Sequence, residues 1–72
     1  FKDKTVVEFG SAPGGAVHYL LSDGAKVIGV DPGAMDTEIL KHKNYKHLSL
    51  PIEKCTRDQF PENIDWVLSD IN

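Results

Sequence analysis

Apolar residues occur along the chain in short runs that turn-forming residues separate. Residues 5–10 and 26–30 are rich in β-branched and other apolar side chains, which is typical of buried strands. Residues 47–50 and 64–68 predict two further strands. Because the first two runs are apolar on both faces, we expect them to be central strands of a parallel sheet that helices cover.

Between these runs, apolar residues recur at helical spacing. One helix is predicted over residues 16–21 and a second over residues 34–42, while the polar residues 53–60 fit only one or two helical turns. Gly24 suits the left-handed position that ends the first helix. The side chains expected on the inner faces of the helices are Val17, Leu20, Leu21, Met35, Ile39 and Leu40. The alternation of strands and helices predicts an open α/β sheet with right-handed crossovers.

The composition is that of a small globular domain. The 72 residues suffice for one domain, and 40% hydrophobic with 26% charged residues is the usual balance of a folded chain. No apolar run approaches the roughly 18 residues of a membrane span. The single cysteine, Cys55, cannot form an internal disulfide, which favours a cytoplasmic location. Since the chain starts abruptly and without an initiator Met, we expect it to be part of a longer protein.

The charge gives little support by itself for a nucleic-acid partner. The formal net charge is −3, and the one basic stretch comprises residues 41–43 with Lys46 and His47 nearby. If the longer protein binds RNA, most of the surface that contacts phosphates is expected outside these residues.

Several other side chains have plain structural interpretations. His18, His42 and His47 show no metal-ligand spacing, so no metal is expected and they are interpreted as surface residues. Trp66 is expected to pack within a strand. Met35 is expected either in the core or against a bound adenine.

The turn after the first strand contains Gly10, Gly14 and Gly15. Glycine lets the backbone take positive φ and approach a ligand closely, and the helix that follows offers free N–H groups to a carboxylate or phosphate. The spacing G-x-x-x-G-G places Ala12 where a dinucleotide-binding loop has its second glycine. The alternative is a tight turn that binds no ligand.

Acidic residues follow two of the predicted strands at the same edge of the sheet. Asp31 comes 21 residues after Gly10, where a carboxylate can accept hydrogen bonds from both ribose hydroxyls; otherwise it would cap the next helix. Asp70 follows the fourth strand, where it could orient a nucleophile, stabilise a sulfonium charge or cap a loop. Glu8, inside the first strand, is interpreted as organising the glycine loop through backbone N–H groups, with exposure at a sheet edge as the alternative.

Three segments carry a family resemblance: residues 7–15 with the loop Ala12-Pro13-Gly14-Gly15, residues 30–35, and residues 65–70. In order and spacing they resemble the FtsJ-like ribose 2′-O-methyltransferases. The A-P-G-G loop is fairly specific to this family among methyltransferases, whose more general loop is G-x-G-x-G. The resemblance implies a class I methyltransferase fold, Rossmann-like, of which residues 1–72 are the N-terminal part that binds S-adenosylmethionine.

The resemblance also implies a reaction and its residues. The implied cofactor-binding residues are Gly10, Ala12, Pro13, Gly14, Gly15, Asp31 and Asp70. The A-P-G-G loop would hold the methionine moiety and Asp31 the ribose, while Asp70 would lie beside the donor methyl as the catalytic member of a Lys-Asp-Lys-Glu set. A lysine would help the 2′-hydroxyl of RNA, ribosomal RNA being expected, to lose its proton before the oxygen attacks the methyl. No metal or membrane is expected to take part.

This sequence departs from the family pattern in three places. Ala16 stands where the family often has Trp, and the third strand ends in residues 50–52 without its acid, Glu53 being the nearest substitute. The two lysines and the glutamate of the catalytic set are expected outside residues 1–72, so these residues alone should be inactive. Two alternatives stay open: a catalytically degenerate module that binds a partner or RNA, and half of a dinucleotide-dependent oxidoreductase.

Overall fold

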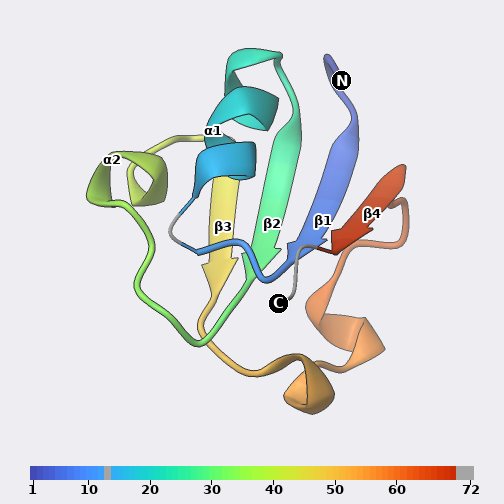
Figure 1. Cartoon of the computed structure of the whole chain (residues 1–72). Coiled ribbons are helices and arrows are strands. Elements are labelled where there is room, and N and C mark those ends of the chain that lie inside the picture. The colour runs from blue at the N-terminus through green and yellow to red at the C-terminus, as the bar shows by residue number, and fades with distance from the viewer. Residues whose placement is uncertain (13, 70–72) are drawn as a thin grey trace.

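The apolar runs form one parallel sheet. The computed structural model describes residues 1–12 and 14–69. Within these residues the strands are β1 (Thr5–Phe9), β2 (Lys26–Val30), β3 (Tyr45–Leu48) and β4 (Trp66–Ser69). Their order in space is β3-β2-β1-β4, and each neighbouring pair is parallel (Figure 1). The predicted α/β fold class with a parallel sheet is confirmed.

The strand order reverses beside β1. The chain runs outward from β1 through β2 to β3 and then returns to place β4 on the other side of β1. In open parallel sheets such a reversal leaves a crevice at the carboxyl ends of the strands, where ligands bind. The glycine loop leaves β1 at this point.

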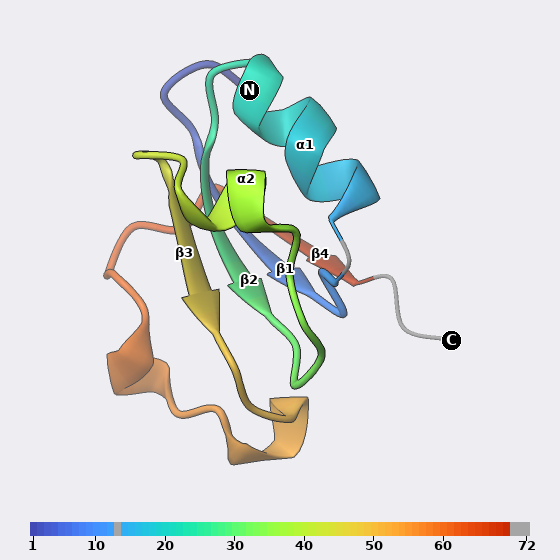
Figure 2. The ribbon, with the colours of Figure 1, turned by 90° about the vertical axis from the view of Figure 1, so that its left-hand side faces the viewer.

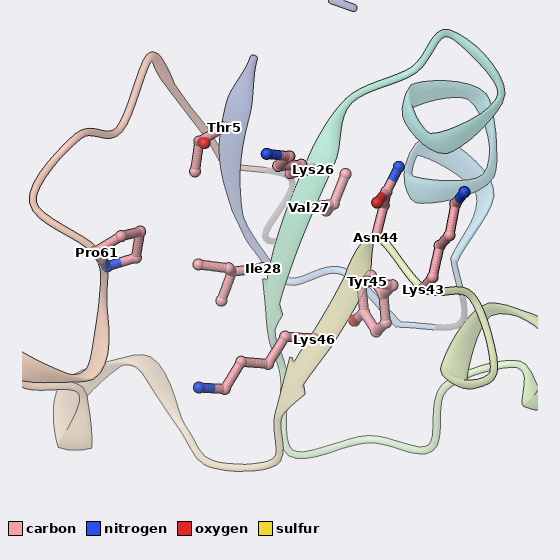
Figure 3. A pocket seen from close by; sticks show the side chains of 9 residues that line it. All are labelled: Thr5, Lys26, Val27, Ile28, Lys43, Asn44, Tyr45, Lys46 and Pro61. Carbon is pink, nitrogen blue, oxygen red and sulfur yellow. The ribbon is translucent and has the colours of Figure 1, made fainter. Parts of the chain in front are cut away.

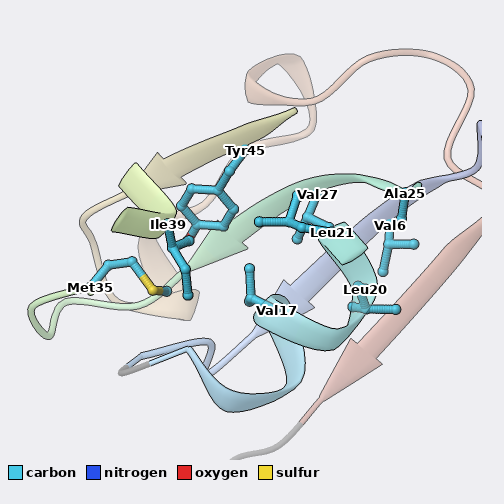
Figure 4. Packing of buried hydrophobic residues seen from close by; sticks show 9 residues of the cluster. All are labelled: Val6, Val17, Leu20, Leu21, Ala25, Val27, Met35, Ile39 and Tyr45. Carbon is cyan, nitrogen blue, oxygen red and sulfur yellow. The ribbon is translucent and has the colours of Figure 1, made fainter. Parts of the chain in front are cut away.

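Helices α1 and α2 cover one face of the sheet. α1 (Gly15–Ser22) is followed by Gly24 at φ 87°, as predicted for its left-handed end. α2 (Thr37–Leu40) is one turn long and shorter than predicted, because Asp36 caps it by accepting a hydrogen bond from the N–H of Glu38. The buried side chains between the helices and the sheet are Val6, Val17, Leu20, Leu21, Ala25, Val27, Met35, Ile39 and Tyr45 (Figure 4).

The connection between β3 and β4 covers the opposite face. It contains the short 3-10 turns η1 (Ile52–Lys54) and η2 (Arg57–Gln59), in the region where the sequence predicted only one or two helical turns. Figure 2 shows α1 and this connection on opposite sides of the sheet. The side chains gathered on this face are the buried Val7, Ile28 and Val30 with the partly buried Phe9, Leu48, Ile52, Cys55, Phe60 and Ile64.

Several sequence expectations were wrong in detail, among them the start of the fourth strand, which is Trp66 rather than residue 64. β3 begins at Tyr45 rather than at residue 47, because the backbone pairs with β2 from Val27 onward. Leu40 is exposed at the end of the single turn of α2. Trp66 lies on a strand at the edge of the described sheet, so that half of its surface is exposed and its ring meets Phe1 edge-on. Of the histidines predicted to be surface residues, His42 and His47 are half-buried.

Candidate functional site

The turn after β1 depends on glycine at two positions. Gly10 has φ 77°, and its N–H donates to the carbonyl oxygen of Val30 at 2.9 Å. Gly14 has φ 120°, and a Cβ there would overlap Ile39 and lie 2.8 Å from the sulfur of Met35. The turn is therefore pressed against α2 and the end of β2, in a conformation that other residues would strain.

The start of α1 is open to a ligand. α1 begins at Gly15, and the first N–H groups of a helix have no acceptor within the helix itself. A Cβ added at Gly15 would meet nothing within 4 Å, and the residue is exposed. Together with the positive end of the helix dipole, this accessible backbone suits a carboxylate or a phosphate.

Asp31 ties the glycine loop to the end of β2. One carboxylate oxygen accepts a hydrogen bond from the N–H of Ala12 at 3.2 Å, and the other accepts one from the N–H of Gly33 at 2.6 Å. Asp31 is half-buried, and a carboxylate oxygen can accept more than one hydrogen bond, so it can also serve a ligand hydroxyl. Because Asp36 caps α2, the alternative in which Asp31 caps the next helix is wrong.

A hollow of about 220 Å³ opens beside Asp31. Its lining residues are Gly10, Val30, Asp31, Pro32, Pro51, Ile52 and Glu53. Asp31, directly after β2, and Glu53, in η1, therefore line the same space, although they are far apart in sequence. Since typical ligand pockets measure about 300–1,000 Å³, this hollow can hold one part of a larger ligand.

Polar side chains are buried beneath the glycine loop. Glu8 is 2% exposed and Ser11 is 4% exposed. The Tyr45 hydroxyl and His47 Nδ1 form a hydrogen bond of 2.7 Å. Burial raises the pKa of Tyr45 above its usual value; the Ser11 hydroxyl opposes that rise, and the negative charges of Glu8 and Asp31 add to it. These groups thus lie close to one another and to the predicted site.

Sequence analysis missed Ser11, Tyr45 and His47 as a group. The signal available was the alternation along β3, which places Tyr45 and His47 on the same face, two residues apart. The predicted bonding of Glu8 to N–H groups of the loop stays a prediction, whereas its predicted burial is confirmed and exposure at a sheet edge is wrong.

A separate hollow of about 460 Å³ lies at the amino ends of β1, β2 and β3, away from the glycine loop (Figure 3). Its lining residues are Thr5, Lys26, Val27, Ile28, Lys43, Asn44, Tyr45, Lys46 and Pro61. The basic stretch seen in the sequence thus supplies two lysines, Lys43 and Lys46, and Lys26 joins them from β2. No carboxylate is among these lining residues.

Two predicted site residues, Pro13 and Asp70, lie outside the described residues. β4 carries the chain to Ser69, which pairs with Phe9 at the end of β1, where the glycine loop begins. Within the described ranges, no group of three or more His, Cys, Asp or Glu residues could hold a metal ion. A search of the same ranges finds no helix long and apolar enough to cross a membrane.

Comparisons with known proteins identify the family of the chain. The profile of the FtsJ-like methyltransferase family matches residues 1–72. The chain is 37% identical over 67 residues to the ribosomal RNA large subunit methyltransferase M of Laribacter hongkongensis. The aligned region covers 93% of this chain and 18% of the relative. It is 34% identical over 67 residues to the protein of the same name from Hahella chejuensis, covering 90% of this chain and 16% of that relative. The chain therefore belongs to the FtsJ-like methyltransferase family.

Proposed function

We propose that this chain is the S-adenosylmethionine-binding part of an enzyme that methylates a ribose 2′-hydroxyl of RNA. The observation that carries the proposal is the hydrogen bond between Asp31 and Ala12, which joins an acid after β2 to the glycine loop after β1. Family membership supports methyl transfer, and the names of the two relatives support ribosomal RNA as the substrate class.

In this proposal the chain holds the two ends of the cofactor at different places. The N–H groups at the start of α1 bind the methionine carboxylate, because the positive end of a helix favours an anion. Asp31 accepts hydrogen bonds from the ribose hydroxyls. Glu53 shares the hollow beside Asp31 and is the proposed partner of the adenine amino group, in place of the acid that the third strand lacks.

The chemical step requires residues beyond these. When bound, S-adenosylmethionine would supply a sulfonium methyl group. The role of Asp70 beside that methyl stays a prediction from the family resemblance. The lysines and the glutamate of the catalytic set are proposed to lie in other parts of the enzyme, so that residues 1–72 alone bind cofactor without turnover. A cytoplasmic location also stays a prediction.

The RNA surface is proposed to be shared with the rest of the enzyme. The chain spans 18% and 16% of the length of the two relatives, and its net charge is −3. Lys26, Lys43 and Lys46, around the hollow at the amino ends of the strands, are the cationic group that could contribute phosphate contacts.

Calorimetric titration tests the cofactor. S-adenosylmethionine and S-adenosylhomocysteine are expected to bind, and NAD is not. Asp31→Ala should weaken both sulfur ligands by about 10- to 100-fold, as expected for the loss of charge-assisted hydrogen bonds of about 1.5–3 kcal/mol. A folded protein that contains the flanking sequence and binds neither sulfur ligand would overturn the proposal.

Methyl transfer to ribosomal RNA tests the reaction. Nucleoside analysis of the product is expected to find 2′-O-methylribose, and Asp70→Ala is expected to abolish transfer. A methylated base instead would overturn the ribose assignment. Cofactor binding without any transfer, by a protein with complete flanks, would favour the degenerate module.

A further inference from the structure

A tyrosine of β3 reaches across β2 to the underside of the glycine loop. In the sheet, Gly29 of β2 lies between Glu8 of β1 and His47 of β3. A Cβ added at Gly29 would overlap the hydroxyl oxygen of Tyr45 and lie 2.5 Å from the hydroxyl oxygen of Ser11. The two hydroxyls therefore meet in the space that any larger residue at position 29 would fill.

This meeting point is buried. Tyr45 is 9% exposed, and its hydroxyl is held by the 2.7 Å hydrogen bond to His47 Nδ1, with the two rings stacked. The Ser11 oxygen is fully buried and has no hydrogen bond of good geometry with the residues that the structure describes. Buried hydroxyls need a hydrogen-bonding neighbour in place of water. For Ser11 that neighbour is the Tyr45 hydroxyl, which is also the group whose pKa Ser11 influences.

Ser11 lies at the middle of the segment that binding would use. Its neighbour Gly10 is hydrogen-bonded to Val30, and its neighbour Ala12 is hydrogen-bonded to Asp31. A shift of Ser11 would move the N–H of Ala12 and, with it, the path of the loop toward the start of α1.

We propose that Tyr45 is a positioning residue for the cofactor loop: its hydroxyl, fixed by His47, supports Ser11 through the gap at Gly29 and so sets where the loop receives the methionine half of the cofactor. The inference rests on the proposed cofactor function. It concerns the methionine half, because Asp31, to which the ribose half is assigned, is also held by the shorter hydrogen bond from the N–H of Gly33.

A packing role for Tyr45 makes a different prediction. Its ring belongs to the buried cluster between the helices and the sheet, beside Val27 and Ile39 (Figure 4). Tyr45→Phe keeps that ring and removes only the hydroxyl. Tyr19→Phe is the matched control, since Tyr19 lies on α1 and is 64% exposed.

The test compares two ligands in the full-length protein. S-adenosylhomocysteine has the amino-acid end, and 5′-methylthioadenosine has the same nucleoside and sulfur without it. Tyr45→Phe is expected to weaken S-adenosylhomocysteine about three- to tenfold, as for the loss of about one hydrogen bond. It should leave methylthioadenosine within about twofold, and Tyr19→Phe should change neither affinity. Equal weakening of both ligands, or of neither, would overturn the inference.

A second measurement does not depend on a ligand. Gly29→Ala is introduced into the wild-type protein and into the Tyr45→Phe variant, and the unfolding equilibria of the four resulting proteins are compared. The added methyl group is expected to raise the unfolding equilibrium constant at least about fivefold more when the tyrosine hydroxyl is present, because that hydroxyl is the atom nearest to the added Cβ, while Ser11 Oγ and the ring carbon Cζ are present in both backgrounds. In the protein that keeps Tyr45, Gly29→Ala should also shift the amide resonances of Ser11 and Ala12.

Two outcomes separate the inference from the function on which it rests. Equal effects of Gly29→Ala in both backgrounds would contradict the placement of the Tyr45 hydroxyl in the gap at Gly29, on which its support of Ser11 depends. Failure of the wild-type protein to bind S-adenosylhomocysteine, with the coupling at Gly29 intact, would instead count against the proposed function and remove the inference with it.

Discussion

The two faces of the sheet are packed to different extents. On the face that α1 and α2 cover, Val6, Val17 and Val27 are no more than 1% exposed. On the other face the strand residues Val7 and Val30 are equally buried, but the connection that covers them has only short 3-10 turns, and its side chains such as Phe60 and Ile64 are partly buried. The glycine loop, the start of α1 and Tyr45 all belong to the first face. The loop side of the candidate site thus rests on the better packed half, as a site that needs fixed geometry requires, whereas the hollow beside Asp31 is also lined by Ile52 and Glu53 of η1.

The two strands that flank β1 also differ in how deeply they are buried. β2 is buried from Val27 to Val30, whereas on β4 Trp66 is 52% exposed and Val67 is 59% exposed. β2 carries Asp31 at its end, whereas Asp70, the predicted site residue that follows β4, lies outside the described residues. On the β4 side the described chain supplies strand pairing and little buried surface.

The largest effect is expected from removing core volume on the helix-covered face. Leu20→Ala should lower the free energy of unfolding by about 2–5 kcal/mol, because Leu20 is 3% exposed and its cavity cannot be filled by water. Ile64→Ala on the other face should cost about 1 kcal/mol, since the partly buried side chain loses fewer contacts. Urea denaturation of the two variants measures the difference. Equal losses would contradict the contrast between the faces.

A smaller effect is expected within the loop itself. Gly14→Ala should lower the free energy of unfolding by about 1–3 kcal/mol. A φ of 120° strains any residue with a Cβ, and Ile39 occupies the space that this Cβ would need. Gly15→Ala should leave stability unchanged or raise it by up to about 1 kcal/mol, since alanine is the better helix former. Thermal denaturation compares the two. A Gly15→Ala variant as unstable as Gly14→Ala would show that the open space at Gly15 is filled.

The buried tyrosine predicts a dependence on alkaline pH. The pKa of Tyr45 is raised in the folded protein above its unfolded value of 10.0, so the unfolded state loses its proton first. The stability that the buried, neutral hydroxyl of Tyr45 contributes is complete below about pH 10. It is lost as the pH rises through the pKa of Tyr45 in the folded protein. The stability of wild type relative to Tyr45→Phe should therefore fall above pH 10. Parallel pH profiles of the two proteins would contradict the burial of an ionisable hydroxyl.

The smallest effect is expected on β4. Val67→Thr should change the free energy of unfolding by no more than about 0.5 kcal/mol, because the side chain is mostly exposed and threonine suits a strand equally well. Urea denaturation checks it. A loss above about 1 kcal/mol would mean that β4 is as tightly packed as β2.

Periodicity in the sequence predicted the parts of the fold that local pattern determines. The strands β1 and β2 and the inner face of α1 were predicted because their apolar spacing is regular and Gly24 marks the helix end. The length of α2 was not, since the cap at Asp36 competes with an earlier start. The exposure of Trp66 was also missed, because it depends on the position of β4 at the edge of the described sheet.

In the candidate site, too, some residues were predicted from local pattern and others were not. The glycines of the loop and Asp31 were predicted from spacing and from their place after strands. The group formed by Ser11, Tyr45 and His47 was not, because it exists only where β3 lies beside Gly29 of β2. Contacts between strands that are distant in sequence leave no local pattern to detect.

The most direct test of the central claim is a titration of the ¹⁵N-labelled protein with S-adenosylhomocysteine, followed by backbone amide resonances. The account predicts shifts that concentrate in residues 10–15 and 31–35 and around Glu53, with little change at Lys26, Lys43 and Lys46 around the hollow at the amino ends of the strands. Shifts centred on those lysines, or no shifts in a folded protein, would contradict the placement of the cofactor site at the carboxyl ends of β1 and β2.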